Sequence, residues 1–428
     1  MSTVKNKAAE FLHRIDLRQY GMVIALCCIA LLFQVLVVAE MDQNFITPRN
    51  ITNIIVQNSY ILILAIGMML VIINGHIDLS VGSVLAFTGA VAAIASGTWG
   101  LPWWAAVLMA VGTGALIGAW QGFWVAYVGI PAFIVTLAGM LVFRGLTIWV
   151  TESRSIAVGD ESFRMLGSGY WGEPTTIGGT AMHLPTLLIG VGAVVALTYV
   201  QIADRRERLR HGLPASSAAL WTVKAVAVAA VTLLFSGMLA LYKGLPVIGI
   251  IVIGLVVVYT FVTNRTVFGR HVYAGGGNLK AAALSGVNTK ATSFWVFVNM
   301  GALAGLAAVV FTARANSANP QAGEMFELDA IASAFIGGAS MSGGIGTVVG
   351  AVVGGLVMGV MRQGMSTLGI GQDQVQIILG LVLLAAVVFD VWNKKRTSTA
   401  PAAEARVPEQ KRGEDSEPAA GEEEKASD

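Results

Sequence analysis

Few residues of this chain carry side chains in a pattern that could do covalent chemistry. The sequence contains no GxxxxGK[ST] phosphate loop, no HExxH zinc motif, no CxxC pair and no nucleophile elbow. Its two cysteines, Cys27 and Cys28, are neighbours in one apolar run, where they behave as small apolar residues. The sequence therefore predicts no catalytic residue, no metal ligand and no nucleotide site of its own.

Isolated polar side chains within long apolar runs are the residues that could instead handle a polar solute. A charged side chain near a bilayer centre costs about 3 kcal/mol on insertion scales, so it needs a partner or a function. Asp78 could cap a helix start or contact a solute. Arg144 could form an ion pair, reach the headgroups or line a path, and neutral amides could bind hydroxyl groups or join helices. The residues predicted to line a path are Gln57, Asn58, Asn74, Asp78, Arg144 and Asn299.

The composition requires a membrane around these residues. Of the 428 residues, 55% are hydrophobic and only 12% are charged, and the mean hydropathy is +0.72. A soluble fold, a disordered chain and a disulfide scaffold are all excluded, because a water-exposed surface needs more charge than this. A net charge of +2 gives no reason to expect nucleic acid.

Apolar runs long enough to cross a bilayer recur along the chain. They predict an all-α polytopic membrane protein of about 10–12 transmembrane helices. One shorter run, 329–342, is typical of a half-helix whose end is buried in protein. The other runs are 20–39, 54–73, 80–97, 103–127, 131–150, 184–203, 218–241, 247–263, 293–312, 345–363 and 374–392.

Basic residues set the predicted orientation. Lys and Arg gather in the head 1–19, in the loops 204–217 and 264–292, and just after the last run. Twelve crossings place all of these segments, and so both termini, on the cytoplasmic side. We expect a transmembrane domain over 20–392 and a disordered cytoplasmic tail over 393–428, because the tail lacks large apolar residues.

Two segments share a pattern that predicts an inverted repeat. Asp78 and Asp329 each lie near the start of a helix rich in Ser, Gly and Ala, and each follows a long apolar helix. The crossing count starts these two helices on opposite sides of the membrane, as in many transporters. Chance similarity between two small-residue helices is the alternative. Dense GxxxG spacings, such as Gly114–Gly118, favour close helix packing within the chain, with a subunit contact as the alternative.

The loop 264–292 holds a short predicted helix, LKAAAL at 279–284. Asn278 is placed to cap its start, Gly275–Gly277 precede it as a hinge, and Ser285-Gly286 end it. A membrane protein driven by a separate motor needs such a cytoplasmic protrusion, although an ordinary loop helix would look the same.

Four strings resemble the monosaccharide permeases of ATP-binding-cassette importers, of the ribose, xylose and galactose type. They are IDLSVGS at 77–83, PAFIVTLAGMLVFRG at 131–145, FGRHVYAGGGNLKAAALSGV at 268–287 and ELDAIASAFIGGASMSGGIGTVVGAVVG at 327–354. The chain is most similar to the xylose and multiple-monosaccharide branch, since ribose-type members lack the helix pair at 184–241. His76 departs from the family, which often has Gly or Glu there.

The resemblance implies a homodimeric inner-membrane channel for a monosaccharide. A periplasmic sugar-binding protein would deliver the solute, and cytoplasmic ATPase subunits would bind the ATP and magnesium. The implied coupling element comprises Gly269, Arg270, Gly277, Asn278, Ala281, Ala282, Ser285 and Gly286. The rival interpretation is an ion-coupled secondary transporter. No chain of Asp, Glu and His crosses the runs, which argues against proton coupling but leaves sodium coupling open.

Overall fold

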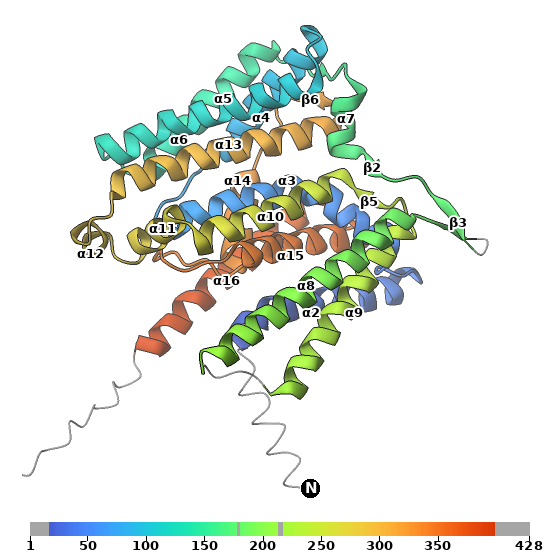
Figure 1. The fold of residues 1–428 in the computed structure, drawn as a ribbon. Helices are drawn as coiled ribbons and strands as arrows, with labels where there is room; N and C mark the ends of the chain where they lie inside the picture. Colours follow the sequence, from blue (N-terminus) through green and yellow to red (C-terminus); the bar gives the residue numbers. More distant parts are fainter. Residues whose placement is uncertain (1–16, 178–179, 213–216, 399–428) are drawn as a thin grey trace, which may run out of the picture. The chain divides into compact units, whose positions relative to one another are not determined.

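A computed structural model describes residues 17–177, 180–212 and 217–398 (Figure 1). Most of the predicted head 1–19, and the tail from residue 399 onward, lie outside these residues. The chain divides into one compact unit that ends at Val387 and a short second unit that begins at Val388. Among the described residues, the second unit holds only the last turns of one helix.

Helices make up most of the described chain, as predicted. Ten of those described are long and apolar enough to cross a membrane, and the 11-residue α14 and the apolar part of α16 are shorter. Two π-helical turns, η1 (Ile94–Thr98) and η2 (Trp124–Val128), extend α4 and α5. The helices are α2 (Leu17–Met41), α3 (Pro48–Ile73), α4 (Val81–Ala93), α5 (Trp103–Phe123), α6 (Ala132–Thr151), α7 (Glu161–Ser168), α8 (Leu184–Arg210), α9 (Ala218–Ala240), α10 (Val247–Arg265), α11 (Val267–Gly277), α12 (Leu279–Leu284), α13 (Thr289–Ala315), α14 (Phe326–Ile336), α15 (Val348–Thr367) and α16 (Gln372–Ser398).

Three small antiparallel strand pairs, which the sequence patterns did not predict, lie together with α7 at one end of the helices (Figure 1). We call this end the strand face and the opposite end, which carries α11 and α12, the α12 face. The pairs are β1 (Ile156–Ala157) with β6 (Ser317–Ala318), β2 (Tyr170–Trp171) with β5 (Leu245–Pro246), and β3 (Thr175–Ile177) with β4 (Thr180–Met182).

Helices α3 and α13 form the centre of the unit and pack on each other. α3 is buried without interruption from Asn58 to Ile73, as expected for a helix that is apolar all round. α13 packs on α4 and α5, while α3 packs on α14 and α15. This reciprocal pattern is compatible with a repeat of α3–α6 and α13–α16, whose inverted orientation stays a prediction.

Glycines allow these helices to cross with their backbones in contact. A Cβ on Gly114 would lie 2.2 Å from the Gly301 carbonyl oxygen, and one on Gly301 would lie 2.1 Å from the Gly114 carbonyl oxygen. In the other half, a Cβ on Gly354 would lie 2.0 Å from the carbonyl oxygen of Ser333. The GxxxG spacings therefore serve packing within the chain, because lipid offers no hydrophobic drive for helix association.

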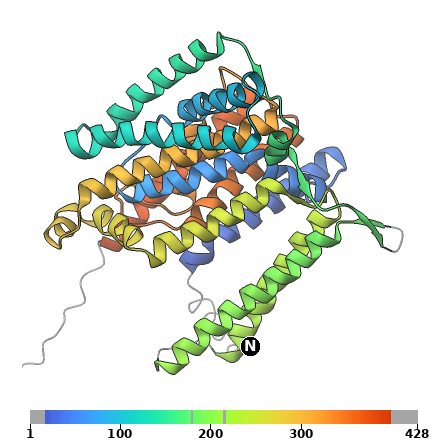
Figure 2. The same ribbon diagram turned by 45° about the horizontal axis from the view of Figure 1, so that its top comes forward.

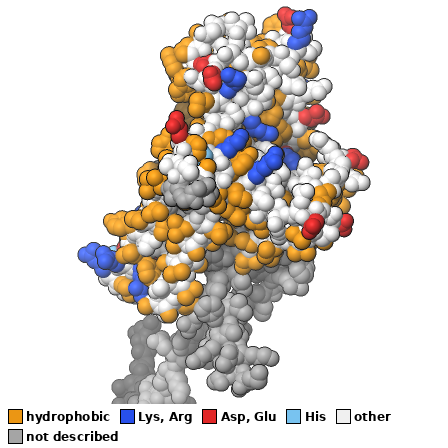
Figure 3. Space-filling model, turned by 90° about the vertical axis from the view of Figure 1, so that its right-hand side faces the viewer, with side chains coloured by type: hydrophobic (Ala, Val, Ile, Leu, Met, Phe, Trp, Pro, Cys, Tyr) orange, Lys and Arg blue, Asp and Glu red, His pale blue; other side chains and the backbone are white. Residues whose placement is uncertain are grey.

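The helix pair α8 and α9, predicted at 184–241, forms a hairpin in which the two helices pack mainly on each other (Figure 2). Its outward side chains, such as Val195, Tyr199 and Leu234, are more than 60% exposed and apolar, which fits a helix surface in lipid. Figure 3 looks onto the strand face, where hydrophobic side chains cover much of the visible surface and Lys and Arg gather near the middle.

Candidate functional site

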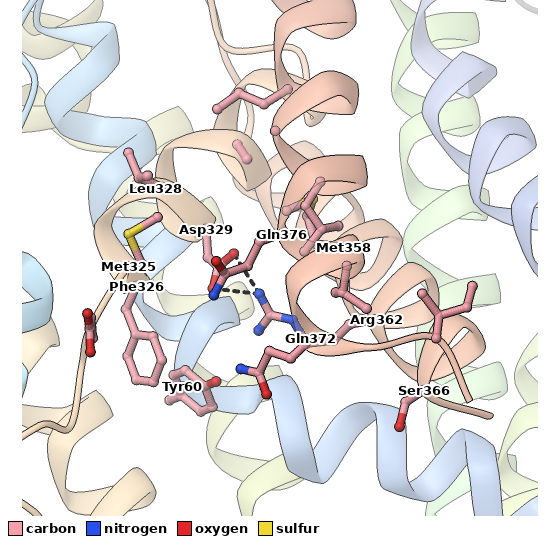
Figure 4. Close-up of a pocket in the computed structure, with 17 residues that line it drawn as sticks. Tyr60, Met325, Phe326, Leu328, Asp329, Met358, Arg362, Ser366, Gln372 and Gln376 are labelled. Atoms are coloured by element: carbon pink, nitrogen blue, oxygen red, sulfur yellow. Dashed lines mark hydrogen bonds and ion pairs between the residues drawn. The ribbon is translucent and has the colours of Figure 1, made fainter. Parts of the chain in front are cut away.

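A cavity of about 690 Å³ lies between α3, α14, α15 and α16 (Figure 4). It opens beside the first turn of α14, the last turns of α15 and the first turns of α16. Its volume is in the range of small-molecule sites, about 300–1,000 Å³. The polar side chains that line it include Tyr60, Asp329, Arg362, Ser366, Gln372 and Gln376.

An ion pair forms the polar wall of this cavity. Nη2 of Arg362 donates to both carboxylate oxygens of Asp329, at 2.8 and 2.9 Å. The Asp329 side chain is 10% exposed and that of Arg362 is 35% exposed, so the pair is partly withdrawn from solvent. Gln376 lies beside the carboxylate, and Gln372 lies beside the guanidinium (Figure 4). The ion pair and the two amides therefore offer both donors and acceptors without net charge of their own, while Glu324 adds a carboxylate elsewhere on the lining.

Aromatic rings form the adjoining wall. The ring centroids of Tyr60 and Phe326 are 4.4 Å apart, and Phe311 meets Tyr60 edge-on at 5.1 Å. A smaller cavity of about 310 Å³ shares Phe326 and Glu324 with the first and is otherwise lined by the segment 319–323 and Phe311. Sequence reasoning missed Tyr60 as a site residue, because one tyrosine in an apolar run is an ordinary core residue.

Arg144 holds the segment that borders these cavities. Its Nη1 donates to the carbonyl oxygens of Ala322, at 2.6 Å, and Pro320, at 3.2 Å. The partners are thus backbone carbonyls rather than the ion pair or headgroups considered from the sequence. Gly323, in the left-handed region at φ +74°, also packs against the backbone of Gly82. The segment before α14 is consequently fixed from α6 and from α4.

Asp78 belongs to a closed network at the start of α4. Its Oδ1 accepts from the backbone N–H of Ser80 at 2.8 Å and from the Ser80 hydroxyl at 2.6 Å. Nε2 of Gln121 donates to the same hydroxyl oxygen at 2.7 Å. Asp78 is 2% exposed and lines neither cavity, so its observed contacts are structural ones, while contact with a solute stays a prediction.

The four amides predicted for the path are not brought together. Asn74 donates to the Ser293 hydroxyl at 2.8 Å, and Asn58 donates to the Ile54 carbonyl at 2.8 Å. Asn299 accepts from the hydroxyl of Tyr259, and the backbone carbonyl of Gln57 accepts from Arg314. None of the six predicted path residues lines either cavity described here, so a path through them stays a prediction.

The predicted helix at 279–284 is α12, and it begins and ends where expected. Asn278 Oδ1 accepts from the Ala281 N–H at 3.0 Å, and Gly286 takes φ +84° just after the helix. Ala282 faces inward, while Leu284 is 90% exposed. The other predicted coupling residues Arg270, Gly277, Ala281 and Ser285 are exposed, whereas Gly269 is buried against the end of α10.

The prediction that Gly275–Gly277 form a hinge is wrong, because these residues are the last turn of α11. The reason is a backbone contact. A Cβ on Gly276 would lie 1.6 Å from the carbonyl oxygen of Ile73 at the end of α3, and that same oxygen accepts from the Gly344 N–H at 2.8 Å. The hydroxyl of Tyr273 also donates to the Gly346 carbonyl at 2.7 Å. The ends of α3 and α11 therefore meet the α14–α15 connection, in what we call the α12-face junction.

A family described as "Branched-chain amino acid transport system / permease component" matches residues 50–387, which include both halves, the cavities and the α12-face junction. The chain belongs to this permease family. It is 37% identical to the xylose transport system permease protein XylH of Haemophilus influenzae over 90% of this chain and 99% of that protein. It is 36% identical to XylH of Escherichia coli K12 (90% and 95% covered) and 34% identical to the ribose import permease protein RbsC of the same strain (86% and 93%). No solved structure matches this permease.

Proposed function

We propose that this permease is the membrane-spanning subunit of an ATP-binding-cassette importer that carries a monosaccharide, such as xylose or a related sugar, into the cytoplasm. The observation that carries the proposal is the similarity to a xylose permease over 99% of that protein's length. A cavity wall of amides and a neutral ion pair also suits a solute that is rich in hydroxyl groups.

A separate ATPase subunit supplies the energy on this proposal. It binds the ATP and magnesium, and it docks on the α12 face, which is then cytoplasmic, as are both termini. The exposed α12 with its Asn278 cap and its projecting Leu284 supports this placement. The coupling residues are those predicted from the sequence, with Ala282 and Gly269 holding the tip and the exposed ones facing the partner.

Two further partners complete the proposed importer. A periplasmic sugar-binding protein delivers the solute to the strand face, and a second copy of the chain completes the channel in the cell inner membrane. The strand pairs and α7 give the strand face a built surface outside the spans, which supports docking there.

Sugar uptake tests the proposal directly. Cells that lack their own pentose and hexose permeases receive this chain together with its ATPase and binding protein, and the uptake of labelled xylose, ribose and galactose is measured. We expect uptake of at least one sugar that is lost without ATP hydrolysis. Uphill transport by the purified chain alone, driven by an ion gradient in liposomes, would contradict the proposal in favour of a secondary transporter.

A matched pair of cap variants tests the coupling role of α12. Asn278→Ala and Asn288→Ala each remove a side-chain acceptor that caps a helix at 3.0 Å, on α12 and α13 respectively. The loss of about 1 kcal/mol should unwind the six-residue α12 but not the 27-residue, packed α13. Asn278→Ala should therefore lower uptake and uncouple ATP turnover from transport, while Asn288→Ala should retain both. Equal uptake by the two variants would argue against coupling through α12.

A further inference from the structure

The cavity between α3, α14, α15 and α16 has the composition of a carbohydrate subsite, and we propose that it binds one neutral monosaccharide during transport. This inference rests on the proposed function and adds a place in this chain where the solute stops. None of the residues that carry it was among those predicted to line the path.

The first argument is the pairing of an aromatic wall with planar polar groups. A sugar ring has apolar C–H faces and a rim of hydroxyls that both donate and accept. Tyr60, stacked with Phe326 at 4.4 Å between centroids, offers an aromatic edge and a hydroxyl. Gln372 and Gln376 of α16 line the same cavity, and their amides carry donors and acceptors together (Figure 4).

The second argument is the state of Arg362. Both of its hydrogen bonds to Asp329 come from Nη2, and Tyr60 is a further side-chain partner, whereas a guanidinium carries five N–H groups in all. The remaining N–H groups are available along the cavity wall for neutral acceptors such as hydroxyl oxygens. Because Asp329 balances the positive charge of Arg362 and Glu324 adds another carboxylate to the lining, an anion gains nothing here, and the wall favours a neutral polar ligand over an anionic one.

The third argument is the contrast with the equivalent place in the other half. At the start of α4, Ser80 accepts from Gln121 and donates to Asp78, so that network is satisfied internally and lines no cavity described here. In the first turn of α14, by contrast, the acidic residue Asp329 lines an open volume of about 690 Å³. That volume accommodates a single sugar ring together with water molecules that bridge to the wall.

Ligand protection in the full-length chain tests the subsite without the rest of the importer. Gln376→Cys and Gln374→Cys are made separately after Cys27→Ala and Cys28→Ala, and each purified protein is placed in lipid nanodiscs. Gln374 is on the same helix but is exposed and does not line the cavity, which makes it the matched control. The measured quantity is the rate of labelling by a small thiol reagent, with and without xylose or leucine.

We expect xylose to slow the labelling of the residue-376 variant and to leave the residue-374 variant unchanged. At a xylose concentration about ten times its dissociation constant, mass action gives roughly tenfold slower labelling. Equal rates with and without any monosaccharide in the residue-376 variant would overturn the subsite. Protection by leucine but not by sugars would overturn the assigned ligand class.

Transport separates this inference from the proposed function. In cells with the complete importer, Gln372→Leu combined with Gln376→Leu should lower maximal sugar uptake by about tenfold, since two hydrogen bonds are lost, while Gln374→Leu transports normally. Normal uptake by the double variant would overturn the subsite and leave the permease role intact. Absence of sugar uptake by the unaltered chain would instead count against the proposed function, while the protection measurement would still decide the subsite.

Discussion

The two halves of the molecule, α3–α6 and α13–α16, each place an acidic residue near the start of their second helix, Asp78 before α4 and Asp329 in the first turn of α14, and treat it in opposite ways. Asp78 is enclosed by Ser80 and its neighbours at 2% exposure. Asp329 is paired with Arg362 on the wall of a cavity. In the first half, Asp78 is thus satisfied by hydrogen bonds within the protein. In the second half, the Asp329–Arg362 pair lines an open cavity, where it can also bind a ligand. One half of a repeat can serve as scaffold while the other keeps a site.

The difference follows from how the second helix of each half packs. α4 contacts α6 directly, and with η1 it continues as far as Thr98. In the second half, α14 ends after 11 residues at Ile336, and the large cavity lies between its first turns and α16. Space that side chains fill in one half is therefore open in the other.

Substitutions at the glycine crossings should have the largest effect on stability, both where α5 crosses α13 and where α14 crosses α15. Gly114→Leu and Gly354→Leu each force a side chain into a carbonyl oxygen of a neighbouring helix, at 2.2 and 2.0 Å from the Cβ. We expect a loss of more than about 3 kcal/mol, because backbone cannot move aside as a side chain can. The measurement is the yield of monodisperse protein in gel filtration. Gly112→Leu, on α5 with nothing within 4 Å of its Cβ, is the control and should purify normally.

Breaking the ion pair between Asp329 and Arg362 should have the next largest effect, and it should disturb only the second half. Asp329→Ala leaves the guanidinium of Arg362 without its carboxylate, which costs about 2–4 kcal/mol; its 35% exposure keeps the value below that of a fully buried pair. Thermal unfolding in detergent would detect the loss. Asp329→Leu combined with Arg362→Met should recover most of it, because no charge is then stranded. A single variant as stable as the unaltered chain would show that the pair is not coupled.

Removing the corresponding contact in the first half should matter less. Gln121→Leu deletes one neutral hydrogen bond to Ser80, worth about 1 kcal/mol, and strands no charge, since Ser80 still donates to Asp78. The same thermal assay should therefore rank this variant well above Asp329→Ala in stability. The reverse order would mean that the closed network, not the ion pair, is the more strongly coupled of the two.

The smallest expected effect is on the pH dependence of stability, and it comes from His76 in the segment between α3 and α4. Burial lowers the pKa of His76 below its ordinary 6.5, so the unfolded chain takes up this proton first as the pH falls. Stability contributed by the neutral ring is therefore present above pH 6.5 and declines as the pH drops through that value. Comparing unfolding at pH 7.5 and 5.5, His76→Gln should lose less stability than the unaltered chain. An identical pH dependence in both proteins would contradict this.

Local and periodic features were predictable from the sequence. Long apolar runs marked the spans, and Asn278 with Gly286 marked both ends of α12, because capping and hydropathy act within a few residues. The pairing of Asp329 with Arg362 was not predictable. It depends on which faces α14 and α15 turn toward each other, and that is decided by Gly354 lying against Ser333. Polar amides such as Asn58 look like path residues in sequence, yet this one bonds to its own helix.

The hinge prediction failed for a related reason. Three consecutive glycines, taken alone, usually indicate a flexible backbone. Here Gly276 is needed because a side chain at this position would collide with a neighbouring backbone. This requirement for glycine could not be predicted, because it arises from contacts with Ile73 and Gly344, which are distant in sequence.

That contact at the α12-face junction has a mechanical consequence. Where Gly276 meets Ile73 and Gly344, peptide backbone lies on peptide backbone, and no side chain stands between them that could yield by changing rotamer. A displacement of α11 by even a fraction of an ångström would therefore also displace the end of α3 in the first half and the α14–α15 connection in the second half. A single methyl group at residue 276 would be enough to force these three backbone segments apart.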